Sequence, residues 1–346
     1  MNIIYVFVML LFQFLFVTDQ AFKFPLSSPL QDSVRIRTSH KVGAAKIVFK
    51  SADGGQTWQD ISEGLPERVK NDDAVAQDVF FTDDNGLYLN TGNGIYHTTA
   101  NSKAPFWETE VFPDSQPRYF GKDSSITAGK KGIFAYNYWE GQFLQKINGT
   151  SLWSPMFTNF DQTRVRTVFE TAGGTVFIGT DNGLFKSANS GKTWKQVQSG
   201  GWVMKMAESN GVLVATSVKG IIRSADNGEN WALVISEGGV GIAVEPIKAG
   251  FAAVTYSAAS NTRRVRASYD AGKTWQPIDD GLPAQLSIIS IVQVGENFFC
   301  GHPIGIFRSS DKGKTWKLLL PSVEGKVFNL SVSGSVIYAI PRNEGC

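Results

Sequence analysis

Short apolar runs separated by glycine-rich polar segments recur along the chain, and each repeat ends in a tryptophan. One repeat shows four such runs, at residues 165–170, 175–179, 183–187 and 192–197. Their length and the turn residues between them predict four short β-strands. The intervals are 49, 46, 41, 37, 44 and 41 residues, between Trp58, Trp107, Trp153, Trp194, Trp231, Trp275 and Trp316. Periods of this size are typical of β-propeller blades.

An eight-residue segment, here called the octet, ends in five of these tryptophans with the pattern Ser-x-Asp-x-Gly-x-Thr-Trp. It occupies residues 51–58, 187–194, 224–231, 268–275 and 309–316, with Asn for Asp in the second copy. The pattern predicts a hairpin between the third and fourth strands of a blade, in which the Asp accepts backbone hydrogen bonds and the Gly supplies a positive φ. Because a repeated unit is predicted to be structural and not catalytic, we assign that role to Asp53, Trp58, Asn189, Trp194, Asp226, Trp231, Asp270, Trp275, Asp311 and Trp316.

The two ends of the chain carry complementary halves of one repeat. Strand signals at residues 327–332 and 336–340 follow Trp316 without another octet, and the first octet lacks a first and second strand before it. The 30 residues after Trp316 and the 16 residues from Gly43 to Trp58 together have the length of one repeat. We therefore predict that the C-terminal strands complete the first blade and close a ring of seven, which removes free sheet edges. Six or eight blades are the alternatives if the degenerate repeats ending at Trp107 and Trp153 are misassigned.

The octet resembles the Asp box, also called the bacterial neuraminidase repeat (BNR). Residues 43–346 are most similar to the photosystem II assembly/stability factor propellers, within the sialidase- and sortilin-like superfamily, because they also carry the Gly-Ile-Phe-Arg-Ser type of strand at residues 305–309. This resemblance implies an all-β fold, a seven-bladed β-propeller of four-stranded blades with Asp-box hairpins. Resemblance to the assembly factors implies that the protein binds other proteins and is not catalytic. Resemblance to sialidases, which carry Asp boxes on six-bladed propellers, implies instead a glycosidase.

Composition and the N-terminal segment narrow the class of partner and the location. The 346 residues are 18% charged, with a formal net charge of +2 and no concentrated basic run, so nucleic acid is not predicted as a partner. Residues 3–17 are almost continuously apolar. They predict a signal peptide or an uncleaved anchor at residues 1–21, and hence a secreted or periplasmic protein. Residues 22–42 are then an extended lead-in, with an edge strand at 34–37, and residues 43–346 a single, monomeric domain without a further membrane span.

Neither a metal site nor a cofactor is predicted. His40, His97 and His302 are scattered, and Cys300 and Cys346 are far apart in the sequence, whereas protein zinc ligands occur at short, characteristic spacings. The two cysteines either pair in an oxidising compartment or, for Cys300 in an apolar run, contribute to packing.

A binding surface is expected on the face opposite the octets, where loops between second and third strands meet loops between blades. Trp139 and Trp202 are the only tryptophans outside the repeat positions. Aromatic rings beside arginines suit a carboxylated sugar or an acidic peptide. The predicted binding residues are Tyr138, Trp139, Arg164, Trp202, Arg263, Arg264, His302 and Arg342.

Two functions are compatible with these features. The first is an exported, non-catalytic scaffold for protein–protein recognition or assembly, with a protein or glycan as its partner. The alternative is a carbohydrate-active enzyme, a sialidase-like glycosidase or a polysaccharide lyase, with its site on the face opposite the octets. A glycosidase needs two carboxylates across a cleft, and spacing nominates no catalytic residue among the available Asp83, Asp84, Glu140 and Asp161. Residues 34–37 also lack the proline of the sialidase Arg-Ile-Pro motif.

Overall fold

The computed structural model describes residues 36–37, 46–66, 80–91, 94–109, 124–130, 132–137, 143–147, 150, 152–156, 163–285 and 287–343. The chain divides into two compact units, Met1–Ser33 and Val34–Cys346. The first unit, with the signal peptide predicted at residues 1–21, lies outside the described residues. Every regular element among the described residues is a strand. A helix with the length and hydrophobicity to cross a bilayer does not occur in this part of the chain.

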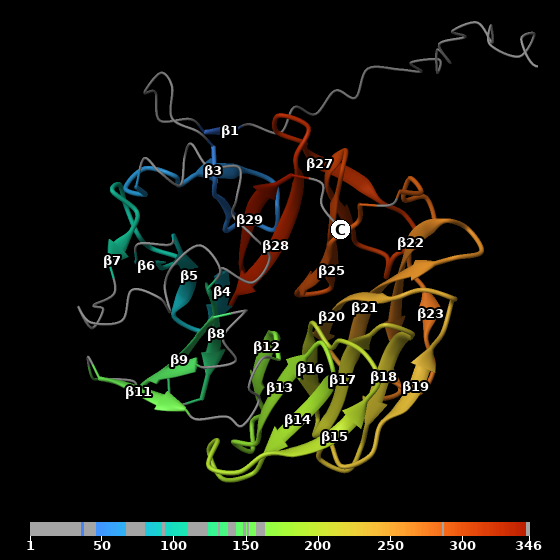
Figure 1. Cartoon of the computed structure of the whole chain (residues 1–346). Coiled ribbons are helices and arrows are strands. Elements are labelled where there is room, and N and C mark those ends of the chain that lie inside the picture. The colour runs from blue at the N-terminus through green and yellow to red at the C-terminus, as the bar shows by residue number, and fades with distance from the viewer. Residues whose placement is uncertain are drawn as a thin grey trace, which may run out of the picture. The chain divides into compact units, whose positions relative to one another are not determined.

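Six sheets are antiparallel arrangements of four consecutive strands, numbered here as blades 2 to 7 (Figure 1). Blade 2 contains β4 (Phe80–Asp83), β5 (Gly86–Asn90), β6 (Ile95–Thr98) and β7 (Glu108–Thr109). Blade 3 contains β8 (Ser124–Gly129), β9 (Gly132–Asn137), β10 (Phe143–Lys146) and β11 (Trp153–Met156). Blade 4 contains β12 (Val165–Glu170), β13 (Val176–Thr180), β14 (Gly183–Ser187) and β15 (Lys195–Ser199).

The remaining consecutive blades have the same strand order. Blade 5 contains β16 (Met206–Ser209), β17 (Val212–Ser217), β18 (Gly220–Ser224) and β19 (Ala232–Ile235). Blade 6 contains β20 (Gly241–Ile247), β21 (Gly250–Ser257), β22 (Thr262–Ser268) and β23 (Gln276–Pro277). Blade 7 contains β24 (Ser290–Val294), β25 (Asn297–His302), β26 (Gly305–Ser309) and β27 (Lys317–Pro321).

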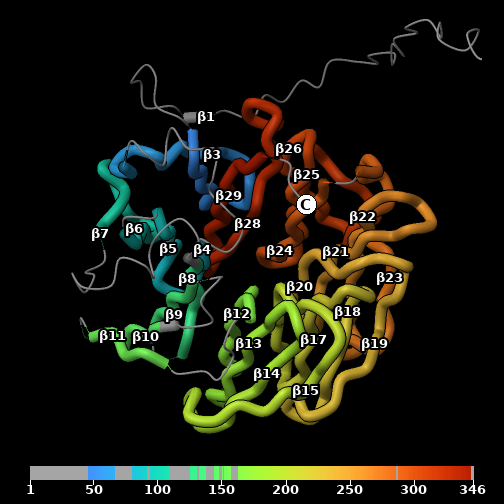
Figure 2. The backbone as a smooth tube through the Cα atoms, in the orientation of Figure 1, coloured from blue at the N-terminus to red at the C-terminus, as the bar shows by residue number. Residues whose placement is uncertain are grey.

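Blade 1 joins the two ends of the described chain and closes the ring, as predicted. Its order is β1 (Ile36–Arg37), β3 (Trp58–Asp60), β2 (Phe49–Ser51), β29 (Val336–Arg342) and β28 (Val327–Ser333). Strand β29 pairs antiparallel with β2, so that Tyr338 lies opposite Lys50. Figure 2 shows the blue N-terminal strands beside the red C-terminal ones. The number of blades is therefore seven, and the strand expected at residues 34–37 is β1, which pairs parallel with β3 at the sheet edge.

Among the described residues, the hydrophobic core consists of seven clusters of buried residues, one between each pair of neighbouring blades. The cluster between blades 7 and 1, for example, contains Phe49 and Trp58 of blade 1 together with Phe299 of blade 7. Each repeat tryptophan packs against the blade that precedes its own. Burial of the aromatic rings therefore ties consecutive blades together, and stabilisation is shared around the ring.

A basic residue directly before four of the octets adds a polar tie to the next blade. The side chains reach the turn that follows β6 or the octet of the next blade. The bonds are Lys50 Nζ to Ala100 O at 3.1 Å, Lys186 Nζ to Glu229 Oε1 at 2.5 Å, Arg223 Nε to Ala271 O at 2.6 Å and Arg308 Nη1 to Gly54 O at 3.4 Å. Burial lowers the pKa of Lys50. These contacts were not predicted from the sequence.

The strand boundaries of blade 4 show where the sequence prediction was accurate and where it was not. The strands expected at 165–170 and 183–187 match β12 and β14. The last strand, expected from residue 192, begins at Lys195. The difference arises because Thr193 is still part of the octet turn, where its backbone N–H donates to Asn189 Oδ1 at 2.9 Å.

Candidate functional site

The octet aspartates accept the hydrogen bonds that shape their own turns. Asp311 Oδ1 accepts bonds from Ser309 Oγ at 2.8 Å and from Thr315 N at 2.9 Å, and Oδ2 accepts one from Thr315 Oγ1 at 2.6 Å. Gly313 N donates to Ser309 Oγ at 2.8 Å. The Thr315 hydroxyl, the Thr315 N–H and the Ser309 hydroxyl lower the pKa of Asp311 to about 2. A carboxylate held in this way is unsuited to accept a proton near neutral pH.

Two octets differ from the Ser-x-Asp-x-Gly-x-Thr-Trp pattern. In both, the side chains at the third and seventh positions still form a hydrogen bond, but an amide nitrogen is now the donor. In the copy with Asn189, its Nδ2 donates to Thr193 Oγ1 at 2.8 Å. In the copy with Asp226, Asn230 Nδ2 replaces the threonine hydroxyl as donor to Oδ2, at 2.7 Å. The backbone N–H of Asn230, the Ser224 hydroxyl and this amide lower the pKa of Asp226. The shared geometry makes the turn, and not the carboxyl group, the common property of the octets.

We call the face with the octet hairpins the box face and the opposite face, with the turns between second and third strands, the loop face. Arg164 and Trp202, two of the predicted binding residues, are brought together on the loop face. Arg164 Nε lies 3.8 Å from Asp181 Oδ2, and Arg166 also pairs with Asp181. The Arg166 guanidinium lies 4.9 Å from the centre of the Trp202 ring. Sequence reasoning missed Arg166 and Asp181, although Asp181 lies in a loop that it had assigned to this face.

Arg263 and Arg264 line a cavity of about 330 Å³ on the loop face of blade 6. Arg264 binds Asp279 through two bonds, Nε to Oδ2 at 2.7 Å and Nη2 to Oδ1 at 3.0 Å. Burial alone would raise the pKa of Asp279, but the bonds from Arg264 and the Val265 N–H outweigh it and lower the pKa. Arg263 Nη1 donates to Ile288 O at 2.9 Å. The loop between blades 6 and 7, which supplies Asp279, was not among the loops singled out from the sequence.

The other predicted binding residues are placed differently. His302 is fully buried, and both ring nitrogens contact the backbone: Ile304 N donates to Nδ1 at 3.1 Å, so that Nε2 carries the proton and donates to Pro283 O at 2.9 Å. Through these two bonds the imidazole fixes two loops to each other. It lies beneath the loop face and not on it. Arg342 is partly buried at the end of β29. Tyr138 and Trp139 lie outside the described residues.

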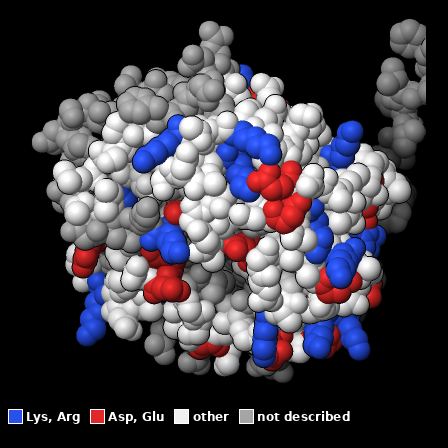
Figure 3. Space-filling view, turned by 90° about the horizontal axis from the view of Figure 1, so that it is seen from below, with Lys and Arg blue, Asp and Glu red and all other residues white. Residues whose placement is uncertain are grey.

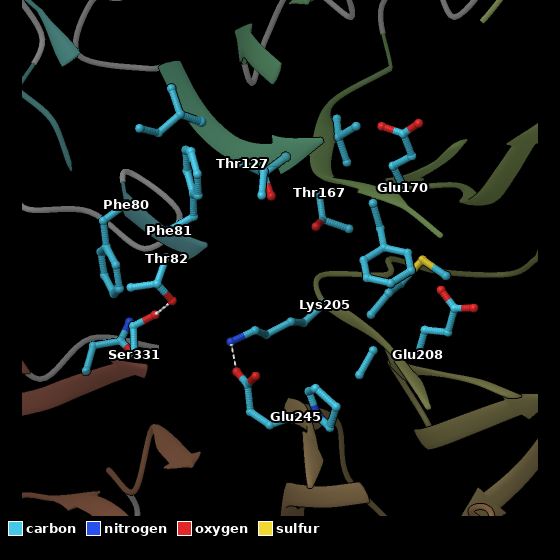
Figure 4. A pocket seen from close by; sticks show the side chains of 18 of the residues that line it. Phe80, Phe81, Thr82, Thr127, Thr167, Glu170, Lys205, Glu208, Glu245 and Ser331 are labelled. Atoms are coloured by element: carbon cyan, nitrogen blue, oxygen red, sulfur yellow. Dashed lines mark hydrogen bonds and ion pairs between the residues drawn. The ribbon is translucent and has the colours of Figure 1, made fainter. Parts of the chain in front are cut away.

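A second cavity, of about 360 Å³, lies in the central channel between the first strands of six blades (Figure 4). Lys205 forms an ion pair with Glu245, and Thr82 Oγ1 lies 2.6 Å from Ser331 Oγ. Glu170 Oε2 accepts a bond from Lys130 N and Glu208 Oε2 one from Ala172 N, both at 2.7 Å. These residues belong to different blades, so no local sequence pattern nominated them.

Of the carboxylates and cysteines considered from the sequence, Asp83, Asp84 and Cys300 are described, and these three show no catalytic arrangement. Asp83 Oδ1 accepts a bond from Asn85 N at 2.8 Å within a turn, and Asp84 is exposed in that turn. Glu140, Asp161 and Cys346 lie outside the described residues. Cys300 is a free, fully buried thiol whose pKa is raised by burial.

The surface chemistry of the described residues is mixed. In the view of Figure 3, acidic and basic side chains are interspersed, and neither sign dominates the visible face. Within the described part of the chain, no group of three or more His, Cys, Asp and Glu residues is arranged to hold a metal ion. Electrostatic attraction of a large polyanion is therefore not favoured by this surface.

Comparison with known proteins identifies the repeat and the architecture. Residues 306–319 match the family model of the BNR-Asp box repeat. The chain is similar to the solved structures of YCF48 from Cyanidioschyzon merolae (13% identity, 77% of this chain and 96% of that chain, TM-score 0.50) and a GH74 xyloglucanase from Xanthomonas campestris (14%, 82% and 53%, 0.57). It is also similar to a virginiamycin B lyase from Staphylococcus aureus (11%, 77% and 96%, 0.56).

These similarities concern the fold alone, because every identity lies far below the level at which function is shared. The chain spans about half the length of the xyloglucanase. No curated protein matches the sequence. The chain is therefore a seven-bladed β-propeller with BNR-Asp box repeats, as the octet geometry, the closed ring of seven sheets and the repeat match together indicate.

Proposed function

We propose that this protein is an exported, non-catalytic scaffold that recognises a protein partner through its loop face. The observation that carries the proposal is the cavity at Arg263 and Arg264, which gives this face a recess of about 330 Å³. Recesses of this size suit the insertion of a partner side chain. The wall offers two arginines and the exposed carboxylate of Asp280, so that polar groups of either charge find a counterpart there.

The rigidity of the site supports recognition without chemistry. Asp279 fixes the guanidinium of Arg264 through two bonds, and His302 fixes the loop at Pro283. A preorganised surface loses little conformational entropy when a partner binds. The cation–π pair of Arg166 and Trp202 adds an aromatic contact on the same face, of the kind enriched at protein interfaces.

The alternative, a glycosidase or lyase, is favoured by the three glutamates of the central cavity, Glu170, Glu208 and Glu245. Two carboxylates facing one another are the requirement for glycoside hydrolysis. Each of these glutamates already accepts a bond from a neighbouring blade. They therefore support the ring, and the enzyme remains the second candidate.

A blocked cavity tests the scaffold proposal. Ala284 is exposed and lines the recess, so Ala284→Trp fills it without removing a buried contact. Ala232→Trp, on the exposed part of β19, is the matched control. Proteins of the producing organism's extracytoplasmic fraction should be retained by immobilised wild-type protein and by Ala232→Trp, and lost with Ala284→Trp. Equal retention on all three contradicts the proposed surface.

The same preparations distinguish the enzyme. Incubation with a glycan panel that includes sialosides and uronic-acid polymers should give no cleavage products. Turnover that survives Ala284→Trp and disappears in Glu208→Gln would replace the scaffold by a carbohydrate-active enzyme with its site in the central channel.

A further inference from the structure

The central cavity has a charge imbalance that the described residues do not compensate. Its wall contains three glutamates and one lysine, and Lys205 is already paired with Glu245. Lys130, at the rim, directs its ammonium group to Ala172 O, at 2.7 Å. Glu170 and Glu208 are therefore left without a cationic partner among the described residues, which favours a positively charged occupant.

Both glutamates also keep one oxygen free of protein contacts in the described part of the chain. Each uses Oε2 to accept a backbone N–H from the turn of the preceding blade. Their Oε1 atoms have no hydrogen-bond or ion-pair partner among the described residues. The bond at Oε2 limits the movement of each carboxylate, and Oε1 keeps its capacity to accept a hydrogen bond from a ligand.

The rest of the wall is apolar or carries hydroxyl groups. Phe80, Phe81, Phe169 and Met206 contribute apolar surface, and Figure 4 shows Phe80 and Phe81 across the cavity from Glu208. An aliphatic chain would contact these side chains, and an ammonium group gains further from an aromatic face. A volume of about 360 Å³ is in the range of small-molecule sites.

We propose that the central cavity binds a primary ammonium group on an unbranched aliphatic chain, with Glu170 and Glu208 as its acceptors. An ammonium group can donate to a carboxylate oxygen of either glutamate, whereas a carboxylate or phosphate ligand would be repelled by both. Two sources carry this chemistry, a free aliphatic diamine and a lysine side chain of a partner protein. This site is separate from the proposed recognition surface, because Glu170 and Glu208 lie at the end of the first strands nearest the box face.

Calorimetric titration with putrescine tests the proposal, with 1,4-butanediol as the uncharged ligand of equal chain length. The protein variants are Glu170→Gln and Glu208→Gln. Glutamine keeps a side-chain oxygen for the backbone N–H of Lys130 or Ala172, so each variant removes the charge and preserves the turn. We expect putrescine to bind the wild type, the diol not to bind, and each variant to bind putrescine about tenfold more weakly.

Glu324→Gln is the control variant, since Glu324 lies in a turn before β28 and its side chain is 69% exposed. Its affinity for putrescine should equal that of the wild type. Thermal unfolding of all variants identifies any that fails to fold, and the remaining glutamate variant then decides. Equal binding of the diol, unchanged affinity in both glutamine variants or no binding of putrescine and of a lysine peptide overturns the proposal.

A short peptide with one internal lysine, and its norleucine analogue, distinguishes the two sources. Binding of the lysine peptide alone assigns the cavity to a partner side chain, and binding of putrescine alone assigns it to a free amine. Ala284→Trp should leave both titrations unchanged, so this test can fail or succeed independently of the loop-face proposal.

Discussion

At the scale of single residues, the octet is a set of matched donors and acceptors. Asp311 pairs with a threonine hydroxyl, Asp226 with an asparagine amide, and Asn189 with a threonine hydroxyl that now accepts the bond. The side-chain donor and acceptor change from octet to octet while the turn persists. The reason is that Oδ1 of the Asp or Asn always accepts a bond from the backbone N–H four residues later. An octet is therefore recognised from sequence by the pair of residues four positions apart.

This pairing predicts a dependence on pH. The pKa of Asp311 is lowered to about 2 in the folded state, whereas that of an unfolded aspartate is about 4. The stabilisation by its ionised form is complete above the unfolded value and is lost as the pH falls through the folded value. Asp311→Asn should lower the melting temperature at pH 7, and the difference from wild type should shrink as the pH approaches 2.

Differential scanning calorimetry between neutral and acidic pH measures this difference. Asp84→Asn, which removes an exposed carboxylate outside the octets, is the control substitution. A constant difference between Asp311→Asn and wild type at all pH values would show that the carboxyl charge is irrelevant to the octet.

Residue identity alone was a weak guide to the candidate site. The guanidinium of Arg264, a predicted binding residue, is held by Asp279, which lies 15 residues further along the chain. His302 is buried because a loop of another segment covers it. Such partners come from inter-blade loops that do not follow the repeat, so no periodicity indicates them.

At the scale of elements, each octet hairpin is fitted against the preceding blade. Gly313 has a φ of 85°, and a Cβ atom at this position would lie 2.4 Å from Ile278 Cβ and 2.5 Å from Ile278 O. The corresponding Gly55 would meet Leu319 and Phe299 across the ring closure. The glycine is therefore required for close packing as well as for the turn conformation.

Substitution by alanine separates these two requirements. Gly313→Ala combines a left-handed backbone with a steric clash, whereas Gly295→Ala, with a φ of 58° and no atom within 4 Å of the added Cβ, has the backbone cost alone. We expect Gly313→Ala to lower the free energy of unfolding by about 2 kcal/mol more than Gly295→Ala does. Urea unfolding of both variants gives the comparison. Equal losses would show that the blade relaxes around the new methyl group.

The elements were predicted well from sequence because their signals repeat. The tryptophan spacing and the octets identified every blade, including those that end at Trp107 and Trp153. The basic residue before the octet was overlooked as an inter-blade tie, since its partner lies in the next blade, 43 or more residues away in the sequence. Contacts between blades were thus less predictable than the blades themselves.

At the scale of the whole molecule, stability depends on the pairing of β2 with β29. The cores on both sides of blade 1 contain residues from the C-terminal strands: Tyr338 packs toward blade 2, and Phe328 toward blade 7. Without β28 and β29, blade 1 would keep only three short strands and two apolar faces would meet water. Closure of the ring therefore stabilises the cores between blade 1 and both of its neighbours, as well as the sheet of blade 1 itself.

Truncation before residue 327 tests this dependence. We expect the shortened protein to lose the cooperative thermal transition of the intact chain and to aggregate, because apolar surface and the edge of β2 become exposed. A chain ending at Asn343 retains every strand and is the control, with an expected melting temperature near that of the wild type. A cooperative, monomeric truncated protein would show that six blades suffice.

The joined blade also sets the order of events in biosynthesis. Strands β2 and β3 are synthesised before the strands of blades 2 to 7, yet their sheet is complete only when β29 has been made. Until then the chain has no closed ring and retains an unpaired sheet edge. The propeller therefore acquires its final shape only after the strands of blade 1 at both ends of the ring have been made.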